Sequence, residues 1–558
     1  MTDISQLPMA LSSPFDHVFP VLTAAQVARM AALGRIRPVS RDDVLVEEGQ
    51  RQAPFFVVRS GEIQIVQSPA EGAALVAVLR SGQFTGELNM FSNRRALMQI
   101  RASGDGEVIE LDHAHVQALV QGDAELGDIL MRAFILRRVE LVAHGLGDAV
   151  VAGSEHCADT LRIREFLTRN GHPHAYIDLD RDAEAQALLD RFAVTMNDVP
   201  VLICRGRVVL RNPSNREVAD CLGLNDPLDT TRVRDLVVVG AGPSGLAAAV
   251  YGASEGLDVL VMESSAPGGQ AGSSSKIENY LGFPMGVSGQ ELTSRAHTQA
   301  QKFGAELQVA TGAARLVCAD RKYAVETTSG VRVQARAVIV ATGAKYRKLA
   351  LPNLSQFEGT GVHYAATSME AQVCGDAEVV IVGGANSAGQ AAVFLARTCR
   401  KVHVLVRSQG LTSTMSRYLI RRIEDNPAIA VHPYTEVVEL EGGDALECIK
   451  WRDNRNGRTE VHRISHVFVM TGATPNTRWL DGCVQLDANG FVKTGPDLTH
   501  EELTSASWPL PRAPYLLETS RPRVFAVGDA RGGNVKRVAS AVGEGSIAVA
   551  LVHQALKA

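Results

Sequence analysis

Two glycine-rich turns are the residues of this chain best suited to chemistry. The first is D235-L-V-V-V-G-A-G-P-S-G, with Gly240, Gly242 and Gly245, and the second, V379-V-I-V-G-G-A-N-S-A, begins at Gly383. Each follows an apolar, strand-like run and opens an Ala-rich stretch typical of a helix, which is the context in which such a turn binds a dinucleotide. Two such sites in series predict a flavin and a nicotinamide nucleotide on one polypeptide, the arrangement of a flavoprotein reductase.

In the first turn, each glycine has its own role. Gly240 permits the tight turn, Gly242 lets the backbone approach a pyrophosphate, and Gly245 lets helix and strand pack closely. The N-terminus of the helix then offers N–H groups to the phosphates. Glu263 lies 18 residues beyond Gly245 at the end of an apolar strand, the spacing of a carboxylate that binds the adenosine ribose. The alternative is a strand–turn–helix that binds no nucleotide.

The second turn has small residues at its three key positions, Gly383, Ala385 and Ala388. The strand that follows, V402-H-V-L-V, ends in Arg407 and not in a carboxylate, and a cation there favours the 2′-phosphate of NADPH. Arg417 is a candidate for a second cation, unless Arg417, Arg421 and Arg422 form a solvated helix face. The predicted NADPH-binding residues are Gly383, Gly384, Asn386, Ser387, Arg407 and Arg417.

Patterns along the chain predict the elements that position these residues. Residues 14–140 contain short apolar runs punctuated by glycine, such as F55-F-V-V-R and I63-Q-I-V, and then a helical segment from about His113 to Leu141, which together predict a small β-roll with helices. Residues 148–225 predict a β-α-β-α-β unit with strands at V150-V-A-G, A175-Y-I-D-L-D and D198-V-P-V-L-I-C. We expect 233–345 and 470–558 to form one flavin domain, interrupted by a nicotinamide domain at 346–469.

Composition excludes several classes of protein. The 558 residues predict three or four domains, and a net charge of −5 without a basic run excludes nucleic acid as a partner. We expect no membrane span and no signal peptide. Eight scattered cysteines without a CxxC favour a reducing cytoplasm, and no metal site is predicted.

Further motifs identify a family. A266-P-G-G-Q, I277-E-N-Y-L-G-F-P, V340-A-T-G-A, T471-G-A-T-P-N-T and V524-F-A-V-G-D-A occur in this order, and over about residues 233–558 the chain resembles the bacterial low-molecular-weight thioredoxin reductases. The resemblance implies FAD, NADPH, a homodimer and a thioredoxin-like partner. It implies that Asp529 binds the ribityl or pyrophosphate part of FAD and that R537-V-A-S lies beside the isoalloxazine ring. The other implied flavin-site residues are Gly269, Gln270, Asn279, Thr342, Gly343, Gly528, Arg537 and Ala539.

The redox-active CxxC of this family is missing. At its place the chain reads G361-V-H-Y-A-A-T-S-M-E, with Ala365 and Ser368 where the cysteines belong. Alanine and serine cannot pass electrons to a disulfide, so the usual mechanism of the family cannot run at this place. Cys374 has no spaced partner, and a buried structural thiol is its simplest role.

A candidate replacement lies upstream in S154-E-H-C-A-D-T. With the run D198-V-P-V-L, this segment resembles the glutaredoxins and thioredoxins and their Val–cis-Pro turn, as a CxxT variant with Cys157 as nucleophile and Thr160 in the second position. A helix N-terminus, and His156 if protonated, would lower the pKa of the thiol. Cys204 and Cys221 are possible resolving thiols or packing residues. The alternative is a spacer with an inert Cys157.

F84-T-G-E-L-N-M-F-S-N-R-R-A resembles the phosphate-binding cassette of cyclic-nucleotide-binding domains. By this resemblance, Gly86, Glu87, Arg95 and Ala96 bind the ligand, with Arg95 on the cyclic phosphate and Glu87 on the ribose 2′-hydroxyl. The loop from Gly86 to Arg95 is about one residue shorter than expected for the family. The alternative is a β-roll that serves only for contacts.

The sequence therefore predicts a multidomain protein with an N-terminal β-roll, a small thioredoxin-like α/β unit and two Rossmann-like dinucleotide-binding domains. The predicted function is that of a cytoplasmic FAD-dependent NADPH oxidoreductase under cyclic-nucleotide control. Three outlets stay open: disulfide reduction through Cys157 or a partner's disulfide, transfer to ferredoxin, quinone, oxygen or another small acceptor, or a redox or nucleotide sensor with incidental turnover.

Overall fold

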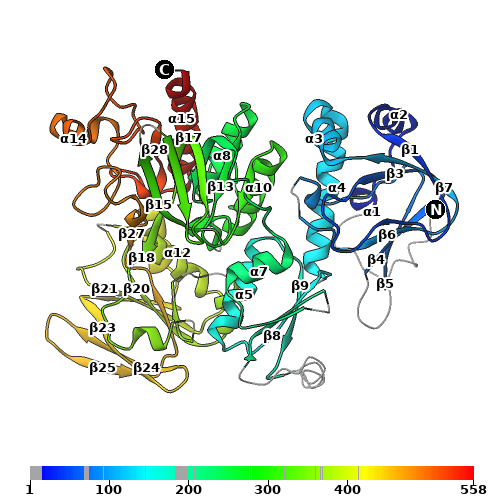
Figure 1. The fold of residues 1–558 in the computed structure, drawn as a ribbon. Helices are drawn as coiled ribbons and strands as arrows, with labels where there is room; N and C mark the ends of the chain where they lie inside the picture. Colours follow the sequence, from blue (N-terminus) through cyan, green and yellow to red (C-terminus); the bar gives the residue numbers. More distant parts are fainter. Residues whose placement is uncertain are drawn as a thin grey trace.

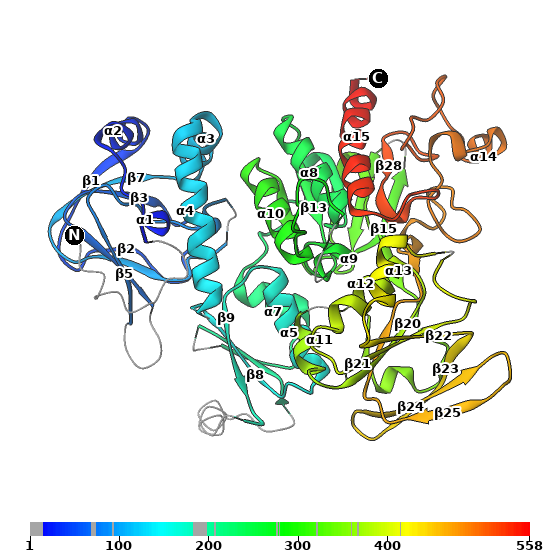
Figure 2. The ribbon, with the colours of Figure 1, turned by 180° about the vertical axis from the view of Figure 1, so that it is seen from behind.

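The computed structural model describes residues 15–67, 74–91, 94–144, 146–181, 198–205, 208–274, 277, 279–319, 322–358, 360–364, 366, 368–412 and 414–557. Within these ranges no helix combines the length and the apolarity needed to cross a bilayer. Figures 1 and 2 show a β-roll at one end of the molecule, a small sheet unit in the middle, and two larger α/β units beyond it.

The β-roll consists of two antiparallel sheets, β1-β7-β3 and β2-β6-β4-β5. The single helix predicted from His113 to Leu141 is in fact two helices, because the Asp123 side chain accepts hydrogen bonds from the N–H groups of Glu125 and Leu126 and begins a new helix. The elements are α1 (Phe15–Val18), α2 (Ala24–Leu33), β1 (Arg35–Val39), β2 (Val44–Val46), β3 (Phe55–Ser60), β4 (Glu62–Gln67), β5 (Ala74–Arg80), η2 (Leu88–Phe91), β6 (Gln99–Ala102), β7 (Gly106–Leu111), α3 (His113–Gly122) and α4 (Ala124–Ala143).

The middle unit is a four-stranded mixed sheet in the order β11-β10-β8-β9. Strand β8 runs parallel to β9 and antiparallel to β10. The second helix predicted for this unit falls at 182–197, outside the described residues. The elements are β8 (Ala149–Gly153), α5 (Ala158–Arg169), β9 (His174–Asp178), β10 (Val201–Cys204), β11 (Val208–Arg211) and α7 (Asn215–Leu222).

The first Rossmann unit is a seven-stranded sheet in the order β14-β13-β12-β17-β16-β15, with β28 on β17. Strand β28 comes from the C-terminal part of the chain and pairs in parallel, Val338 opposite Val524. The elements are β12 (Val233–Val239), α8 (Pro243–Ser254), β13 (Val259–Met262), α9 (Gly269–Gly272), α10 (Gly289–Lys302), β14 (Glu306–Gln308), β15 (Ala313–Ala319), β16 (Lys322–Thr327), β17 (Arg332–Val340), η6 (Gly495–Asp497), α14 (His500–Ser505), β28 (Val524–Ala526), η7 (Gly528–Ala530) and α15 (Val538–Lys557).

The second Rossmann unit has a five-stranded parallel sheet, β19-β26-β20-β21-β22, flanked by the antiparallel sheet β23-β24-β25. The short pair β18 (Ala344–Tyr346) and β27 (Ala473–Pro475) joins it to the first unit. The other elements of this unit are η4 (Leu354–Gln356), β19 (Val362–His363), α11 (Ser368–Val373), β20 (Glu378–Val382), α12 (Asn386–Leu395), β21 (Lys401–Val406), α13 (Arg417–Glu424), β22 (Ile429–Pro433), β23 (Thr435–Gly442), β24 (Leu446–Asp453), β25 (Thr459–His462) and β26 (His466–Val469). The next element in the chain, η5 (Arg478–Leu480), packs against the first Rossmann unit.

The middle unit and the first Rossmann unit share one hydrophobic core. Ala266 and Val309 of the first Rossmann unit belong to the same buried cluster as Val151, Phe166 and Leu167 of the middle unit. Removal of apolar surface from water is the main favourable contribution to such contacts. The two units are therefore packed together as a body, not joined by a linker alone.

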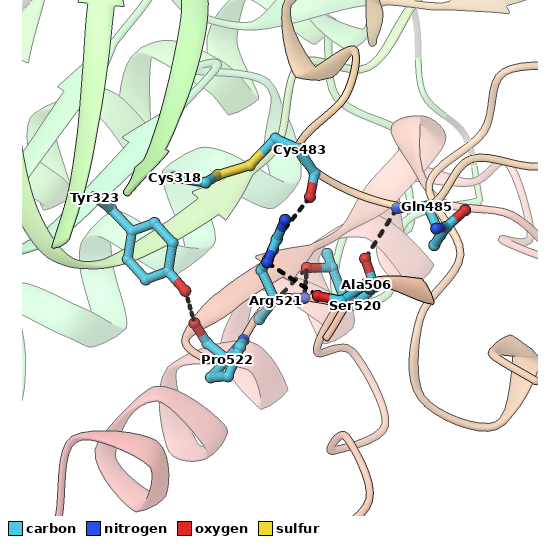
Figure 3. Close-up of a disulfide and its surroundings, with 9 residues drawn as sticks. Cys318, Tyr323, Cys483, Gln485, Ala506, Ser520, Arg521 and Pro522 are labelled. Atoms are coloured by element: carbon cyan, nitrogen blue, oxygen red, sulfur yellow. Dashed lines mark hydrogen bonds between the residues drawn. A yellow bond between two sulfur atoms is a disulfide. The ribbon is translucent and has the colours of Figure 1, made fainter. Parts of the chain in front are cut away.

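A disulfide joins Cys318 of β15 to Cys483, 165 residues later, with a Cα–Cα distance of 6.2 Å (Figure 3). Next to it, the guanidinium of Arg521 donates to the carbonyl oxygen of Cys483 at 2.9 Å. The sequence-based expectation of reduced cysteines is thus not met at this pair. Their long separation in the chain, without any motif spacing, explains why sequence alone did not indicate it.

Candidate functional site

The first glycine-rich turn lies between β12 and α8, at the carboxyl end of the strand. Gly240 has φ +109°, and a Cβ on it would lie 2.3 Å from the carbonyl oxygen of Ala341. A Cβ on Gly245 would lie 1.8 Å from the carbonyl oxygen of Gly240. Any side chain at either position would therefore disrupt the turn. Helix α8 begins at Pro243 with Gly242 as its N-cap, so its first N–H groups are free for an anion.

Glu263 holds this turn in place from the end of β13. One carboxylate oxygen of Glu263 accepts a hydrogen bond from the Ala241 N–H at 2.8 Å, and the other accepts from the Ser265 N–H at 2.9 Å. The oxygen bonded to Ser265 also accepts from Ser264 Oγ at 3.3 Å, whereas the oxygen bonded to Ala241 can accept a second bond. The contacts therefore leave acceptor capacity for the ribose that the sequence analysis assigned to Glu263.

Orphaned polar groups lie in the loop that follows β28. Burial raises the pKa of Asp529, although Lys536 opposes this effect, and the carboxylate has no hydrogen-bond partner among the described residues. Both polar atoms of the Asn534 side chain are buried without a partner. Unsatisfied buried groups are costly, so this loop fits a polar ligand such as the ribityl or pyrophosphate part of FAD.

Among the remaining predicted flavin residues, Gly269, Thr342 and Gly528 lie beside the same turn. Gly242 and Gly269 face each other, since a Cβ on Gly269 would lie 3.0 Å from Gly242 Cα. The Gln270 side chain donates to the carbonyl oxygen of Ala344. Thr342 Oγ1 donates to the Asn476 carbonyl oxygen at 2.8 Å, and the Asn476 N–H donates to the Gly343 carbonyl oxygen at 3.0 Å. The Gly528 N–H donates to the Glu544 carboxylate at 2.7 Å. Asn279, Arg537 and Ala539 are exposed.

The second glycine-rich turn repeats this arrangement between β20 and α12. Gly383 has φ +149°, and a Cβ on it would lie 2.4 Å from the carbonyl oxygen of Met470. Thr414 Oγ1 donates to the Gly384 carbonyl oxygen at 2.6 Å, and Asn386 Oδ1 accepts from the Ser416 N–H at 2.7 Å. The loop before α13 is therefore tied to this turn.

Two cations flank the second turn. Arg407 follows β21 and Arg417 opens α13, and both are exposed, as is Ser387. Neither guanidinium has a hydrogen bond or an ion pair with a described residue. Arg421 is exposed on the same helix, so the solvated-face interpretation of these arginines stays open. Arg407 and Arg417 remain free to read a phosphate.

Cys157 is the N-cap residue of α5 and is half-buried. The Val199–Pro200 peptide bond is cis, and a Cβ on Gly153 would lie 2.3 Å from Thr160 Oγ1 and 3.1 Å from Pro200 Cβ. The start of α5, the end of β8 and the cis-proline turn therefore meet, as the glutaredoxin resemblance implies. Thr160 is fully buried, and its hydroxyl has no partner among the described residues.

The two possible resolving thiols are not brought to Cys157. Cys204 pairs with Ala149 at the start of β8, whereas Cys157 lies beyond Gly153 at the other end of that strand. A hydrogen bond between the two thiols raises the pKa of Cys204 and lowers that of Cys221. Cys204 and Cys221 thus form their own pair at the other end of the sheet.

The place of the missing dithiol lies near the middle unit. Ala365 falls outside the described residues, and Ser368 is the first residue of α11. Cys374 is fully buried just after α11, and burial raises the pKa of its thiol. Burial and then the charge of His156, next to Cys157, lower the pKa of His466 on β26. The segment around Cys157 therefore lies close to this end of the second Rossmann unit.

A cavity of about 120 Å³ lies inside the β-roll. Its wall includes Gly86, Glu87 and Ala96 together with apolar side chains such as Val46, Ile65 and Leu97. Arg137 donates to the carbonyl oxygen of Gly86 at 2.8 Å, and the carboxylate of Glu87 pairs with Arg138. An apolar wall with a few convergent polar groups is typical of a small-molecule site.

Two arginines line this wall, Arg94 and Arg137, and Arg95 does not. Burial and the nearby Arg138 lower the pKa of Arg94 to about 10, so it stays charged at neutral pH. Arg95 does not line the cavity: a Cβ on Gly223 of the middle unit would lie 2.7 Å from Arg95 Nε. The predicted contact of Arg95 with a cyclic phosphate remains a prediction, and Arg94 is a candidate that the sequence analysis missed.

Three arginines connect the cavity to the predicted flavin loop through the end of α5. Arg94 donates to the carbonyl oxygen of Asn170 at 2.9 Å, and Arg138 donates to that of Gly171 at 3.3 Å. The adjacent Arg169 donates to the carbonyl oxygens of Ala266, Pro267 and Gly269 at 3.2, 3.4 and 3.0 Å. His297 of α10 is buried at the same junction, where burial and then the charges of Arg94 and Arg138 lower its pKa to about 3.

Comparisons with known proteins agree with this geometry. The sequence model of the pyridine nucleotide-disulphide oxidoreductase family matches residues 234–545, and that of the cyclic nucleotide-binding domain matches residues 36–123. The chain belongs to the pyridine nucleotide-disulphide oxidoreductase family. The predicted multidomain fold, the predicted NADPH-dependent flavoprotein oxidoreductase and both family resemblances at the two ends of the chain are confirmed. Membership implies FAD and NADPH.

Individual relatives are thioredoxin reductases. That of Streptomyces coelicolor is 32% identical over 273 residues, which are 49% of this chain and 84% of that protein. The NADPH-dependent thioredoxin reductase 3 of Arabidopsis thaliana is 30% identical over 361 residues, 62% of this chain, and the match spans 64% of that relative's length. The crystal structure of T. acidophilum thioredoxin reductase superposes with a TM-score of 0.51 at 26% identity, covering 58% of this chain and 98% of that one.

Proposed function

We propose that this chain is an FAD-dependent NADPH oxidoreductase whose turnover depends on a nucleotide bound in the β-roll. The hydrogen-bonded path from Arg94 through Asn170 and Arg169 to Gly269 carries the proposal, because it joins the β-roll cavity to the predicted flavin loop. When bound, FAD supplies two-electron chemistry: it accepts hydride from NADPH and passes the electrons to a second acceptor.

The residues of the chain would bind and orient the reactants. Gly240, Gly242 and Gly245 would let the pyrophosphate of FAD approach the start of α8, with Glu263 on the ribose and Asp529 on the ribityl or pyrophosphate part. The turn at Gly383 would hold NADPH, and Arg407 and Arg417 would bind its 2′-phosphate. These assignments are supported by the glycine contacts, the unpartnered Asp529 and the two free cations.

In the β-roll cavity, the ligand would be a cyclic nucleotide. The apolar wall suits a nucleobase, and the positive charge of Arg94 suits a cyclic phosphate. A bound phosphate would compete with the Asn170 carbonyl oxygen for Arg94, and the ribose hydroxyl would compete with Arg138 for Glu87. Arg94 and Arg138 also donate hydrogen bonds to the residues that follow α5. A nucleotide bound in the cavity would weaken these hydrogen bonds and so change the contacts of α5 with the predicted flavin loop. Such control requires that the nucleotide bind one arrangement of the units better than another.

The first candidate outlet is a thiol–disulfide exchange at Cys157, because that residue sits at the start of α5 beside the cis-proline turn, as in the glutaredoxin-like pattern. The relatives are named thioredoxin reductases, so a thioredoxin-like protein is the partner to test first, with this chain as a homodimer. With Cys204 and Cys221 at the other end of the sheet, Cys157 would act as a single thiol that needs a thiol from outside the middle unit to complete the exchange.

A second candidate outlet is transfer from the flavin to ferredoxin, quinone or oxygen. It is favoured by the absence of any CxxC among the eight cysteines of the chain. In this case no protein thiol takes part, and Cys157 would serve the structure of the middle unit.

The decisive experiment is anaerobic reduction of the purified, flavin-loaded protein by NADPH, followed by a panel of acceptors with and without cAMP. Two results together would support the proposal: NADPH bleaches the flavin, and the rate of turnover with at least one acceptor depends on cAMP. A protein that binds no FAD after reconstitution would contradict the enzyme assignment. Normal reduction without any effect of cAMP or cGMP would contradict the regulatory part alone.

A further inference from the structure

Two imidazoles and a thiol converge at one edge of the second Rossmann sheet. His363 ends β19, His466 begins the neighbouring strand β26, and Cys374 follows α11. One ligand atom from each of the three side chains lies within 4.8 Å of the other two. The three residues come from separate segments of the chain. The sequence analysis gave Cys374 only the role of a buried structural thiol and gave the two histidines none.

The distance between the imidazoles matches metal coordination. His363 Nε2 lies 3.3 Å from His466 Nδ1. Two nitrogens bound to one tetrahedral Zn²⁺ at about 2.0–2.1 Å lie about 3.3–3.4 Å apart, and a thiolate sulfur binds the same ion at about 2.3 Å. Nitrogen and sulfur donors suit Zn²⁺, whereas Ca²⁺ and Mg²⁺ require oxygen donors.

A single hydrogen bond between the imidazoles would explain only part of this geometry. Cys374 is fully buried, and its sulfur has no hydrogen-bond partner among the described residues. The neighbouring Cys399 donates to the backbone carbonyl oxygen of Cys374 and not to its sulfur. A hydrogen bond between His363 and His466 therefore leaves this buried thiol unused beside them, while a metal ion would use all three groups.

We propose that His363, Cys374 and His466 bind one Zn²⁺ ion, with water in the fourth position. Binding converts the thiol to a thiolate and releases its proton. Zn²⁺ has no redox chemistry, so the ion would not carry electrons in place of the missing dithiol. Instead it would fasten α11 to β19 and β26, which is the segment where the family resemblance places the CxxC. His466 is only partly buried, which gives the ion a way in.

The test measures zinc binding directly and does not depend on turnover. The flavin-loaded protein is treated with a chelator, dialysed, and titrated with ZnCl₂ by calorimetry, and bound zinc is counted by elemental mass spectrometry. We expect one tight Zn²⁺ per chain. Loss of an outer-shell partner of a metal ligand lowers metal affinity by roughly 10–100-fold. Cys374→Ser and His466→Gln remove ligands themselves, so each should lower the affinity for Zn²⁺ by more than that. Cys448→Ser and the exposed His500→Gln serve as matched controls and should keep the ion.

Cobalt provides an independent readout, and flavin content reports folding. Co²⁺ added to the metal-free parent protein should give a thiolate-to-cobalt charge-transfer band. The band is seen by subtracting the spectrum of Co²⁺-treated Cys374→Ser at the same flavin content. The proposal would be overturned if the parent protein bound Zn²⁺ no more tightly than Cys374→Ser does. A cobalt spectrum without the charge-transfer band would also overturn it. If Cys374→Ser loses its flavin, His466→Gln, altered at a partly exposed position, decides the matter by the same titration.

Discussion

The guanidinium of Arg169 donates to the carbonyl oxygen of Gly269 at 3.0 Å, from the last turn of α5 to the first residue of α9. The same nitrogen also reaches the carbonyl oxygens of Ala266 and Pro267. One side chain of the middle unit thus fixes the loop that the sequence analysis assigned to the flavin. The predicted flavin loop is therefore held by the helix that Cys157 caps.

Removal of this side chain should loosen the predicted flavin loop. Hydrogen bonds from a charged donor each contribute about 1.5–3 kcal/mol, so Arg169→Ala should weaken FAD binding by roughly tenfold or more. Fluorescence titration of the flavin-free protein with FAD measures the effect. Arg216→Ala is the matched control, because Arg216 bridges the same two units at Thr311. Equal FAD affinity in the two variants would rule out a specific role for Arg169.

Asp529→Asn tests the proposed flavin contact itself. The Asp529 carboxylate is half-buried and has no partner among the described residues, and we expect a bound FAD to supply the missing donor. Loss of the charge should cost on the order of 1.5–3 kcal/mol of FAD binding free energy. Asp444→Asn, on an exposed turn of the second Rossmann unit, should leave FAD binding unchanged. Retention of full affinity by Asp529→Asn would place the contact elsewhere.

Discrimination between NADPH and NADH should depend on Arg407. Removing one charge-assisted phosphate contact should lower kcat/KM for NADPH by about 10–100-fold while leaving that for NADH nearly unchanged. Arg417→Ala should act in the same direction if Arg417 is the second cation. Arg421→Ala, exposed on the same helix, is the control. Unchanged selectivity in both Arg407→Ala and Arg417→Ala would show that neither residue reads the 2′-phosphate.

Cys157→Ser separates the two candidate outlets. Hydride transfer from NADPH to the flavin needs no protein thiol, so stopped-flow bleaching of the flavin should keep its rate. Turnover with a disulfide substrate should fall at least 100-fold if Cys157 is the nucleophile. Cys221→Ser should have little effect, since Cys221 lies with Cys204 at the other end of the sheet. Full disulfide turnover in Cys157→Ser would assign that activity to another group.

His297 should make the junction between α10 and the β-roll sensitive to acid. Its folded pKa of about 3 lies below the unfolded value of about 6.5, so the unfolded state binds a proton that the folded state does not. The contribution of His297 to the free energy of unfolding is therefore fully present above about pH 6.5. It is lost as the pH falls below that value, by about 2 kcal/mol at pH 5. Comparing the urea unfolding midpoints of the parent protein and His297→Leu at pH 7 and pH 5 should show a smaller acid loss in the variant. The exposed His500→Gln should behave like the parent protein.

Sequence predicted the parts of this protein that are encoded locally. The turns at Gly240 and Gly383 require glycine because of a neighbouring backbone carbonyl, and this requirement is visible in a short motif. The division of the predicted 113–141 helix at Asp123 is also local, since aspartate caps helices, but the apolar periodicity on both sides hid it. Motif spacing thus reports the residues of a turn more reliably than the ends of a helix.

Contacts between distant segments were not predictable. Arg94 and Arg95 are adjacent, and only the packing of the middle unit decides that Arg94 lines the cavity while Arg95 lies against Gly223. His363, Cys374 and His466 show no metal-binding spacing, because the parallel pairing of β19 with β26 brings together residues about a hundred positions apart. A single sequence contains no signal for such pairings.

The Cys318–Cys483 bridge turns the second Rossmann unit into part of a covalently closed ring, because every residue from β19 to β26 lies between the two cysteines. A protease that cuts once within this unit would leave two fragments that migrate as one chain until a reductant is added. The bridge lies at the base of the ring, beside the sheet of the first Rossmann unit (Figure 3), so the enclosed unit keeps its attachment even when its own backbone is broken.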